Sequence, residues 1–220
     1  MKKIPCLFER EVGEDGQFNR LVIDQPNSQA DVQWVLDGEG IATKKYDGTC
    51  CYINPAGKLY KRYDAKIDKK TGDFKTPPEN FLPAQSPDKI TGHWPGWVPV
   101  DFEAKSDQRH VEAFDNLIGM SKQTEKRSLF GAGVRPGTYE LIGPKVNGNP
   151  ENVDSHILVY HGDVIYNSFP RTFDEIRERL IVLNVEGVVF HRKPGAMFGN
   201  DMVKIRLADF GLERKKHIDV

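Results

Sequence analysis

Apolar and polar residues alternate over short stretches in much of this chain, and such alternation predicts β-strands with one face toward a core. The clearest stretches are 50–64, 137–143, 156–162, 163–169, 186–192 and 202–210. The turn-forming sequence NPAG at 54–57 interrupts the first of them, which predicts two strands joined by a tight loop. Hairpin-like runs outnumber strand-helix alternations, so antiparallel sheets are expected.

Three other segments show the wider spacing of an amphipathic helix. The first can begin at Ser28 and stop at Gly38, and the second can begin at Ser106. The third begins at Thr172, which pairs with Glu175 in the pattern of a capping box. Their expected buried positions are Val32, Val35, Leu36, Val111, Phe114, Leu117, Ile118, Phe173, Ile176 and Leu180.

The segment 75–100 interrupts these patterns with six prolines and with Trp94 and Trp97. Prolines at this density prevent a regular helix, so a long and partly apolar loop is expected. Long loops in compact domains are often functional lids. A surface loop pinned by its two tryptophans explains the same composition.

The predicted fold class is α+β, with two antiparallel sheets flanked by helices. No internal repeat, low-complexity tract or composition shift marks a linker between domains. A chain of 220 residues can bury one substantial core, so a single domain over residues 1–220 is expected.

Composition removes several classes of function. The formal net charge of -1 gives no global positive field, so nucleic-acid contacts must come from local clusters. Three cysteines, two of them adjacent at Cys50 and Cys51, fit neither a disulfide framework nor a zinc motif, which favours a reducing, cytoplasmic compartment. No apolar run approaches the roughly 20 residues of a membrane span, so a soluble protein without a membrane partner is expected.

Several charged residues occupy strands that are otherwise apolar. In 202–210, Lys204 and Arg206 share one face, and Val203, Ile205 and Leu207 share the other. Glu186 precedes an apolar run, so its carboxylate is expected to be partly buried and compensated by a cation or metal. Glu140 lies within another short apolar strand. Taken singly, a solvated strand face or a structural ion pair explains each of them.

The segment KKYDGT at 44–49 places Lys45 two residues before Asp47 and three before Gly48, at the start of a strand. A KxDG pattern alone is short enough to be an accidental turn. Here it is the first of five charged motifs in a fixed order, which an accidental turn does not explain. The series is Lys45-Tyr46-Asp47-Gly48-Thr49, Arg62, Tyr139-Glu140-Leu141, Glu186-Gly187-Val188-Val189 and Lys204-Ile205-Arg206.

This series resembles the covalent nucleotidyltransferase superfamily of RNA ligases, DNA ligases and mRNA capping enzymes, over residues 40–210. The segments YELIGPKVNGNPEN and HWPGWVPV look most like small stand-alone RNA ligases related to a vertebrate 5′-3′ RNA ligase. The resemblance implies a nucleotidyltransferase domain, similar to an ATP-grasp domain. Only fourteen residues follow Arg206, too few for the OB-fold that many relatives carry.

The resemblance implies that Lys45 attacks the α-phosphate of ATP and carries AMP on its side-chain nitrogen. Catalysis would then involve Lys45, Asp47, Lys204 and Arg206. Nucleotide binding would involve Lys44, Gly48, Arg62, Glu140, Tyr160, Glu186, Lys204 and Arg206. A divalent metal, Mg²⁺ or Mn²⁺, would be held by Glu186 and Asp47. Tyr160 is the expected base-stacking residue, and a tyrosine packed within a strand is the alternative.

The implied partners are ATP and RNA ends that carry a 5′-phosphate and a 3′-hydroxyl. The enzyme is expected to be a monomer that joins these ends in RNA repair. Three alternatives stay open: a GTP-dependent capping-type guanylyltransferase, a DNA ligase, and a nucleotide-binding module without catalysis. Base preference separates the first, and the absent OB-fold argues against the second. The third is disfavoured because Lys45, Asp47, Glu186 and Lys204 are all present. Lys145 and Asn147 are candidate nucleic-acid contacts, although turn chemistry explains their segment better.

Overall fold

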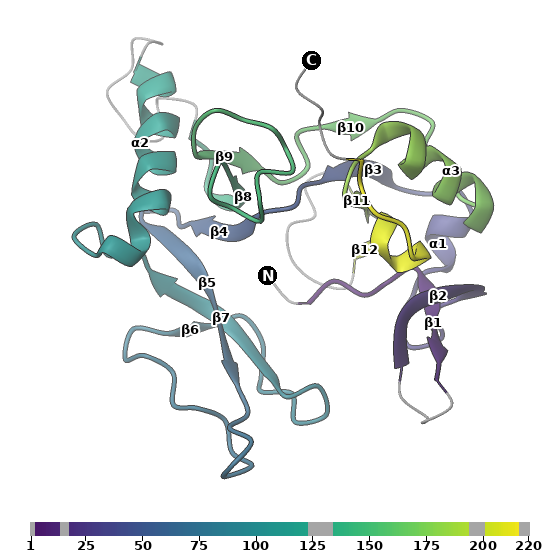
Figure 1. Ribbon diagram of the computed structural model, residues 1–220, viewed down its shortest axis with the longest axis horizontal. Helices are drawn as coiled ribbons and strands as arrows, with labels where there is room; N and C mark the ends of the chain where they lie inside the picture. The colour runs from purple at the N-terminus through teal and green to yellow at the C-terminus, as the bar shows by residue number, and fades with distance from the viewer. Residues whose placement is uncertain (1–2, 14–17, 123–133, 194–200, 216–220) are drawn as a thin grey trace. The chain divides into compact units, whose positions relative to one another are not determined.

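A computed structural model describes residues 3–13, 18–122, 134–193 and 201–215, which fold into two compact units (Figure 1). The middle unit comprises residues 47–160. The flanking unit comprises residues 3–46 together with residues 161–220. Each unit has its own main sheet and its own apolar core.

The middle unit is built on a six-stranded antiparallel sheet with the order β6-β7-β5-β4-β8-β9. Its elements are β4 (Thr49–Ile53), β5 (Leu59–Lys66), β6 (Leu82–Pro83), β7 (His93–Pro99), η1 (Lys105–Asp107), α2 (Gln108–Lys122), β8 (Gly137–Ile142) and β9 (Ile157–Tyr160). β4 and β5 form the hairpin predicted around 54–57. β5 and β7 continue as a pair to Lys66, beyond the N-terminal end of β4 (Figure 1).

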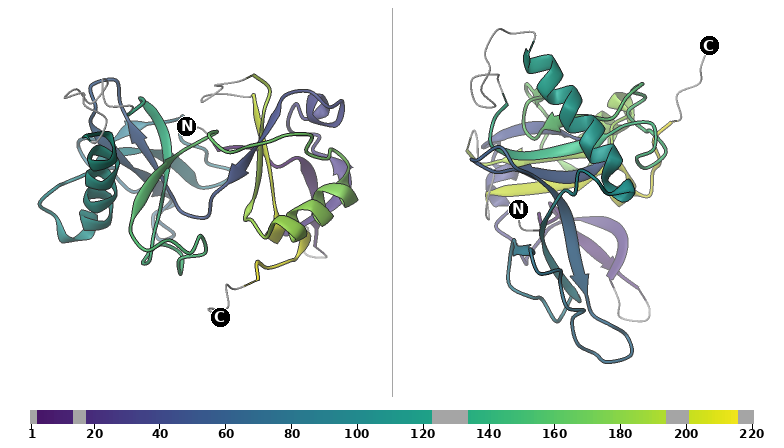
Figure 2. Two further views of the ribbon diagram at one scale, coloured as in Figure 1. Left: turned by 90° about the horizontal axis from the view of Figure 1, so that it is seen from above. Right: turned by 90° about the vertical axis from the view of Figure 1, so that its left-hand side faces the viewer.

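Helix α2 covers one face of this sheet (Figure 2). Its Phe114 packs in one core with Cys51 and Ile53 of β4 and with Leu141 of β8. These strand residues are alternate positions, as the sequence pattern predicts. The residues between them, which include Glu140, therefore belong to the opposite face of the sheet.

The flanking unit contains a four-stranded antiparallel sheet with the order β10-β3-β11-β12 and a separate two-stranded sheet, β1-β2. Its elements are β1 (Phe8–Val12), β2 (Phe18–Pro26), α1 (Gln33–Leu36), β3 (Ile41–Lys45), β10 (Ile165–Tyr166), α3 (Phe173–Leu183), β11 (Gly187–His191), β12 (Met202–Arg206) and η2 (Leu207–Phe210). A parallel bridge joins Cys6 to Lys204 along β12.

Helices α1 and α3 pack against the same face of the four-stranded sheet (Figure 2). Trp34 of α1 and Leu180 of α3 lie in one core with Ala42, Val188 and Ile205, which come from β3, β11 and β12. Each fully buried aliphatic side chain of this kind stabilises the fold by roughly 1.5–3 kcal/mol. The opposite face of the same three strands carries the charged motifs.

The predicted α+β class and the antiparallel pairing are confirmed for the described residues. Those residues form three sheets, whereas two were expected, because the β1-β2 hairpin has no counterpart in the sequence-based prediction. The expectation of one domain stays a prediction. Among the described helices, none has the length and apolar character required to cross a membrane.

The predicted helices exist, but their starts differ. α1 is capped at Val32, while the backbone N–H of Ser28 donates to the Glu9 carboxylate at 2.6 Å. α2 begins at Gln108, two residues after the expected Ser106. Thr172 is the N-cap of α3, but its hydroxyl donates to the Glu175 carboxylate at 2.6 Å and caps no backbone N–H. The expected capping box is therefore incomplete.

The prediction of a loop over 75–100 was wrong at its C-terminal end, where β7 is an interior strand of the sheet. The carbonyl of Pro95 accepts a hydrogen bond from Ala84, which lies just after the short outer strand β6. The nitrogen of a strand residue points to the same side as its carbonyl, so the N–H missing from Pro95 costs nothing in the pairing with β5. Pro99, four residues later, has the same orientation.

Candidate active site

The lysine face is the name used here for Lys45, Lys204 and Arg206, which lie on the side of the four-stranded sheet opposite its core. Gly187 pairs with Lys45 on one side and with Arg206 on the other, so these two cations share a row across β3, β11 and β12. The next row joins Thr43, Val189 and Lys204. The predicted clustering of cations on one strand face is therefore present within this unit.

Gly187 is required between the two cations of the first row. A Cβ atom on this residue would lie 2.3 Å from the carbonyl oxygen of Ile205. Only a residue without a side chain permits such a close approach of neighbouring backbones. The glycine of the EGVV motif is therefore required by the close packing of β11 against β12, whatever the role of its glutamate.

Lys44 lies on the other face of β3 from Lys45, because neighbouring side chains alternate. Its ammonium group is 4.4 Å from the ring centroid of Tyr46. The structure therefore does not place Lys44 with the lysine face. Its predicted part in nucleotide binding stays a prediction.

Lys45 forms an ion pair with Glu186 at the end of β3. Its Nζ donates to Glu186 Oε2 at 2.6 Å and to the Tyr46 carbonyl at 3.4 Å. The side chains of Lys45 and Glu186 are 22% and 18% exposed, so the pair is shielded from water on most sides. A charge-assisted hydrogen bond in such surroundings holds the lysine nitrogen in one place.

Lys204 is the most perturbed cation of the lysine face. Burial, followed by the positive charges of Lys45 and Arg206, lowers its pKa to about 8, and the negative charge of Asp209 opposes this effect. The amine of Lys204 therefore shares an electrostatic environment with the proposed nucleophile. An anion beside these groups would relieve their repulsion.

Arg206 is held by Asp209, a fully buried carboxylate that the sequence analysis did not identify. The Nη2 of Arg206 donates to Asp209 Oδ1 at 2.6 Å, and its backbone N–H donates to Oδ2 at 2.9 Å. The hydrogen bond to Asp209 raises the pKa of the Arg206 guanidinium. Arg10 donates to the same carboxylate at 3.4 Å. The only sequence signal was an aspartate three residues after a basic strand.

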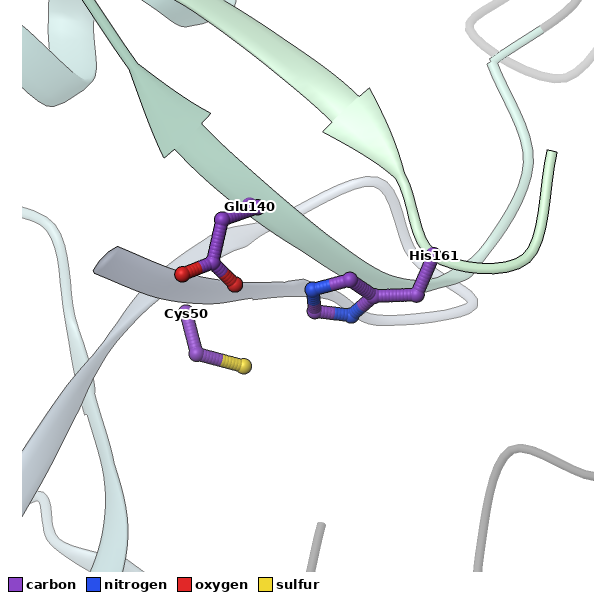
Figure 3. Close-up of side chains that lie close together, drawn as sticks. All are labelled: Cys50, Glu140 and His161. Carbon is purple, nitrogen blue, oxygen red and sulfur yellow. The ribbon is translucent and has the colours of Figure 1, made fainter. Parts of the chain in front are cut away.

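The acidic face is the name used here for Cys50, Arg62 and Glu140, on the side of the middle unit's sheet opposite α2. Cys50 and Glu140 are direct partners on β4 and β8, and Figure 3 shows their side chains on the same side of the two strands. Glu140 is 8% exposed. Burial lowers the pKa of Arg62, and the charges of Cys50 and Asp64 oppose this effect.

Asp47 and Gly48 open the middle unit, and both are bound by a loop that follows β8. The side-chain amide of Asn147 donates to Asp47 Oδ1 at 2.8 Å and to the Gly48 carbonyl at 3.2 Å. A Cβ atom on Gly48 would lie 2.2 Å from the Leu141 carbonyl oxygen, so this turn requires glycine. The sequence indicates turn chemistry for Asn147, or a contact with RNA, and contains no signal for this bond.

Tyr160 lies on the α2 side of its sheet, because it pairs with Tyr139 and not with Glu140. The Tyr139 and Tyr160 rings meet edge to face, with centroids 5.0 Å apart. The guanidinium of Arg135 lies 4.0 Å from the Tyr160 ring centroid. The structure therefore separates Tyr160 from the acidic face and gives it a packing role that needs no nucleotide.

The carboxylates expected to hold a metal fit a hard divalent cation by their chemistry. Glu186 and Asp47 offer oxygen atoms, which are the ligands that Mg²⁺ and Mn²⁺ prefer. Both side chains are partly accessible, and each already has one oxygen fixed by a hydrogen bond, from Lys45 and from Asn147.

Comparisons with known proteins give an independent view of this chain. The sequence model of the RNA ligase 1 family matches residues 69–215, which is more than half of the chain. That match begins after Gly48, so it does not depend on the KxDG motif. The relation to RNA ligases that the motifs predicted is confirmed.

Individual relatives cover most of the chain. RNA ligase 1 of Danio rerio is 28% identical over 284 aligned positions, which cover 96% of this chain and 81% of the relative. RNA ligase 1 of Mus musculus is 27% identical over 262 positions, covering 89% and 77%. RNA ligase 1 of Pongo abelii is 26% identical over 259 positions, covering 89% and 78%. The chain belongs to the RNA ligase 1 family.

Proposed function

We propose that this protein is an ATP-dependent RNA ligase that carries AMP on Lys45 and seals a 5′-phosphate to a 3′-hydroxyl. The observation that carries the proposal is the lysine face, where the Lys45 nitrogen is fixed by Glu186 next to two further cations. Membership of the RNA ligase 1 family supports the substrate class.

The first step would be attack by the Lys45 amine on the α-phosphorus of ATP. The new bond joins Nζ to phosphorus, the bond from that phosphorus to the bridging oxygen breaks, and pyrophosphate leaves. A protonated amine has no free electron pair, so it must first lose a proton. A carboxylate 2.6 Å from Nζ is within reach to accept that proton or to pass it to water.

Neutralisation of phosphate charge is the main catalytic demand of such a transfer. Lys204 and Arg206 of β12 supply two positive charges on the same face of the sheet as Lys45 of β3. Asp209 fixes the direction of the Arg206 guanidinium. Five N–H groups on a guanidinium suit the oxygens of a phosphate. The same two residues would serve each of the three transfers, because each develops charge on phosphate oxygens.

Glu186 and Asp47 would hold a divalent cation, which when bound supplies further positive charge to the phosphate oxygens. The proposed contacts of the nucleotide in the middle unit are Arg62 for phosphate and Glu140 for ribose. Gly48 would allow the backbone to approach the nucleotide closely. Lys44 and Tyr160, which lie on the opposite faces of their strands, are the least supported members of the predicted set.

In the second step, an oxygen of the RNA 5′-phosphate would attack the phosphorus of the adenylate. A pyrophosphate linkage forms and the bond to Nζ breaks, which returns the Lys45 amine. In the third step, the 3′-hydroxyl of the other RNA end would attack the 5′-phosphorus. It loses its proton, AMP leaves, and the phosphodiester bond is complete.

The decisive experiment is to incubate the purified protein with Mg²⁺ and α-phosphate-labelled ATP or GTP and to measure label that stays on the denatured protein. Label from ATP, absent in Lys45→Ala, is the expected result. Lys69→Ala is the matched control, because Lys69 is an exposed lysine in the turn after β5. It should label like the wild type.

Substrates then separate the remaining possibilities. The labelled protein should lose its AMP to 5′-phosphorylated RNA and join it to a 3′-hydroxyl end, with less transfer to DNA of the same sequence. Label from GTP would instead indicate capping chemistry. Label from neither nucleotide would overturn the proposal and leave a binding protein.

A further inference from the structure

We infer that Asn147 is a positioning residue for the proposed adenylation, because it holds both Asp47 and Gly48 of the KxDG motif. The inference rests on the proposed function and adds a residue to its machinery. The Asn147 amide lies 2.8 Å from Asp47 Oδ1 and 3.2 Å from the Gly48 carbonyl oxygen. One side chain therefore fixes a side chain and a main-chain group of adjacent residues.

The chemistry of the two partners requires an amide at this position. A carboxylate and a carbonyl are both acceptors, so only the NH₂ group of asparagine can satisfy them together. An aspartate at 147 would place acceptors against acceptors and a second negative charge beside Asp47. The bond to Asp47 is charge-assisted, which makes it stronger than an ordinary amide hydrogen bond.

The backbone of the loop sets the direction of the Asn147 side chain. Asn147, Gly148 and Asn149 all have positive φ angles, of 48°, 78° and 57°. Asparagine and glycine tolerate this left-handed region best. The turn is closed by a hydrogen bond of 2.8 Å from the Asn149 N–H to the Val146 carbonyl, and Val146 is buried in the core of the middle unit.

Helix α2 anchors the same loop through three polar side chains on one of its faces. Arg109 donates to the Lys145 carbonyl at 2.7 Å, and Asn116 donates to the His156 carbonyl at 2.9 Å. The Glu112 carboxylate, between them on the helix, accepts from the His156 backbone N–H at 3.2 Å. Both ends of the loop are thus tied to a rigid element.

The anchoring of the loop allows the exposed hydrogen bond from Asn147 to Asp47 to hold Asp47 in place. Asn147 is exposed, and water competes for its amide. A bond from a side chain on a flexible loop would stabilise little, because forming it costs conformational entropy. Here the loop backbone is already fixed, so the amide points at Asp47 before the bond forms. Among the described residues, no hydrogen bond reaches Asp47 Oδ2, so the contact from Asn147 orients Asp47 with its second oxygen available for the reaction.

The test compares Asn147→Gly with Asn152→Gly. Glycine keeps the left-handed backbone at both positions and removes only the side chain. Asn152 has a φ of 50° in the same loop, is exposed, and makes no side-chain hydrogen bond to any described residue. The rate of adenylation should fall about 10- to 100-fold in Asn147→Gly, as for other lost partners of oriented carboxylates. ATP affinity and the unfolding temperature should stay near those of Asn152→Gly.

Asn147→Asp should lose at least as much rate as Asn147→Gly, since it adds repulsion. Amide hydrogen exchange in the peptide over 46–50 provides a measurement that needs no activity, and it should be faster in Asn147→Gly than in Asn152→Gly. Equal adenylation rates in the two glycine variants would overturn the positioning role. A wild-type protein that takes no label would overturn the proposed function and this role with it, while the exchange data would still decide whether Asn147 holds the turn.

Discussion

The Nζ of Lys45 lies 2.6 Å from Glu186 Oε2, across the pair of strands β3 and β11. Glu186 immediately precedes Gly187, the residue that pairs with both Lys45 and Arg206. The KxDG and EGVV motifs, which are 141 residues apart, therefore meet through one ion pair. This contact explains why the two motifs occur together, since each supplies one half of it.

Glu186→Gln should slow adenylation strongly without unfolding the protein. The variant keeps the size of the side chain but loses the charge that holds the Lys45 amine, and misplacement of a reacting group costs about 100-fold in rate. The two side chains are only 22% and 18% exposed, so loss of the pair should lower the free energy of unfolding by about 1–3 kcal/mol. Single-turnover labelling with ATP and denaturant unfolding measure the two effects.

Glu213→Gln is the matched control for this prediction, because Glu213 is exposed in the same unit. It should change neither the rate nor the stability. If Glu186→Gln labelled as fast as Glu213→Gln, the ion pair would have no part in the reaction.

The buried amine of Lys204 should make stability depend on pH. Its pKa falls from the ordinary 10.5 to about 8 in the folded protein, mainly through burial. Between these pH values the unfolded chain binds more protons than the folded chain, so the free energy of unfolding rises with pH. Below pH 8 the cost of burying the charge is fully present, and it corresponds to about 3 kcal/mol.

Lys204→Met removes this titration and should be more stable than the wild type at pH 7. The difference between the two should shrink from pH 8 to pH 10.5, as measured by urea unfolding across that range. Lys89→Met, at an exposed loop lysine, should keep the wild-type dependence on pH. A constant difference between Lys204→Met and the wild type would show that Lys204 has an ordinary pKa.

Asp209→Asn should destabilise the flanking unit and slow adenylation together. The neutral amide cannot satisfy the Arg206 guanidinium and the Arg206 backbone N–H as the buried carboxylate does. Loss of partners of this kind costs about 1–3 kcal/mol, and an unfixed Arg206 neutralises phosphate less well. Arg10→Ala, which removes the longer contact to Asp209 at 3.4 Å, should have a smaller effect on both. Equal effects of the two variants would contradict the role assigned to Arg206.

The sequence pattern was sufficient where a property depends on one strand. Alternation within 202–210 correctly predicted that Lys204 and Arg206 share a face, because the period of a strand is set by its own backbone. It was insufficient for Asn147, whose partner Asp47 is 100 residues away, and turn chemistry gave no sign of that bond. Pro95 suggests a loop, yet β7 tolerates it because its missing N–H lies on the outer side of that strand.

Motif spacing also cannot predict toward which face of a sheet a side chain points, as Tyr160 shows. Motif spacing selected Tyr160, but the register of β9 on β8 places its side chain with Tyr139 and away from Glu140. A shift of one residue in register would have reversed the two faces. That register depends on side chains from both strands and cannot be derived from either alone.

Tyr160→Leu should therefore leave ATP affinity within about twofold of the wild type and lower the unfolding temperature. Leucine retains apolar contact with the core but loses the ring contacts with Tyr139 and Arg135. Aromatic pairs are worth about 0.5–1.5 kcal/mol, which should appear in the stability. A base stacked on this ring would instead cost about 1–3 kcal/mol of binding when the ring is removed. Calorimetric titration with ATP separates the two outcomes, and a loss of affinity in that range would return Tyr160 to the nucleotide site.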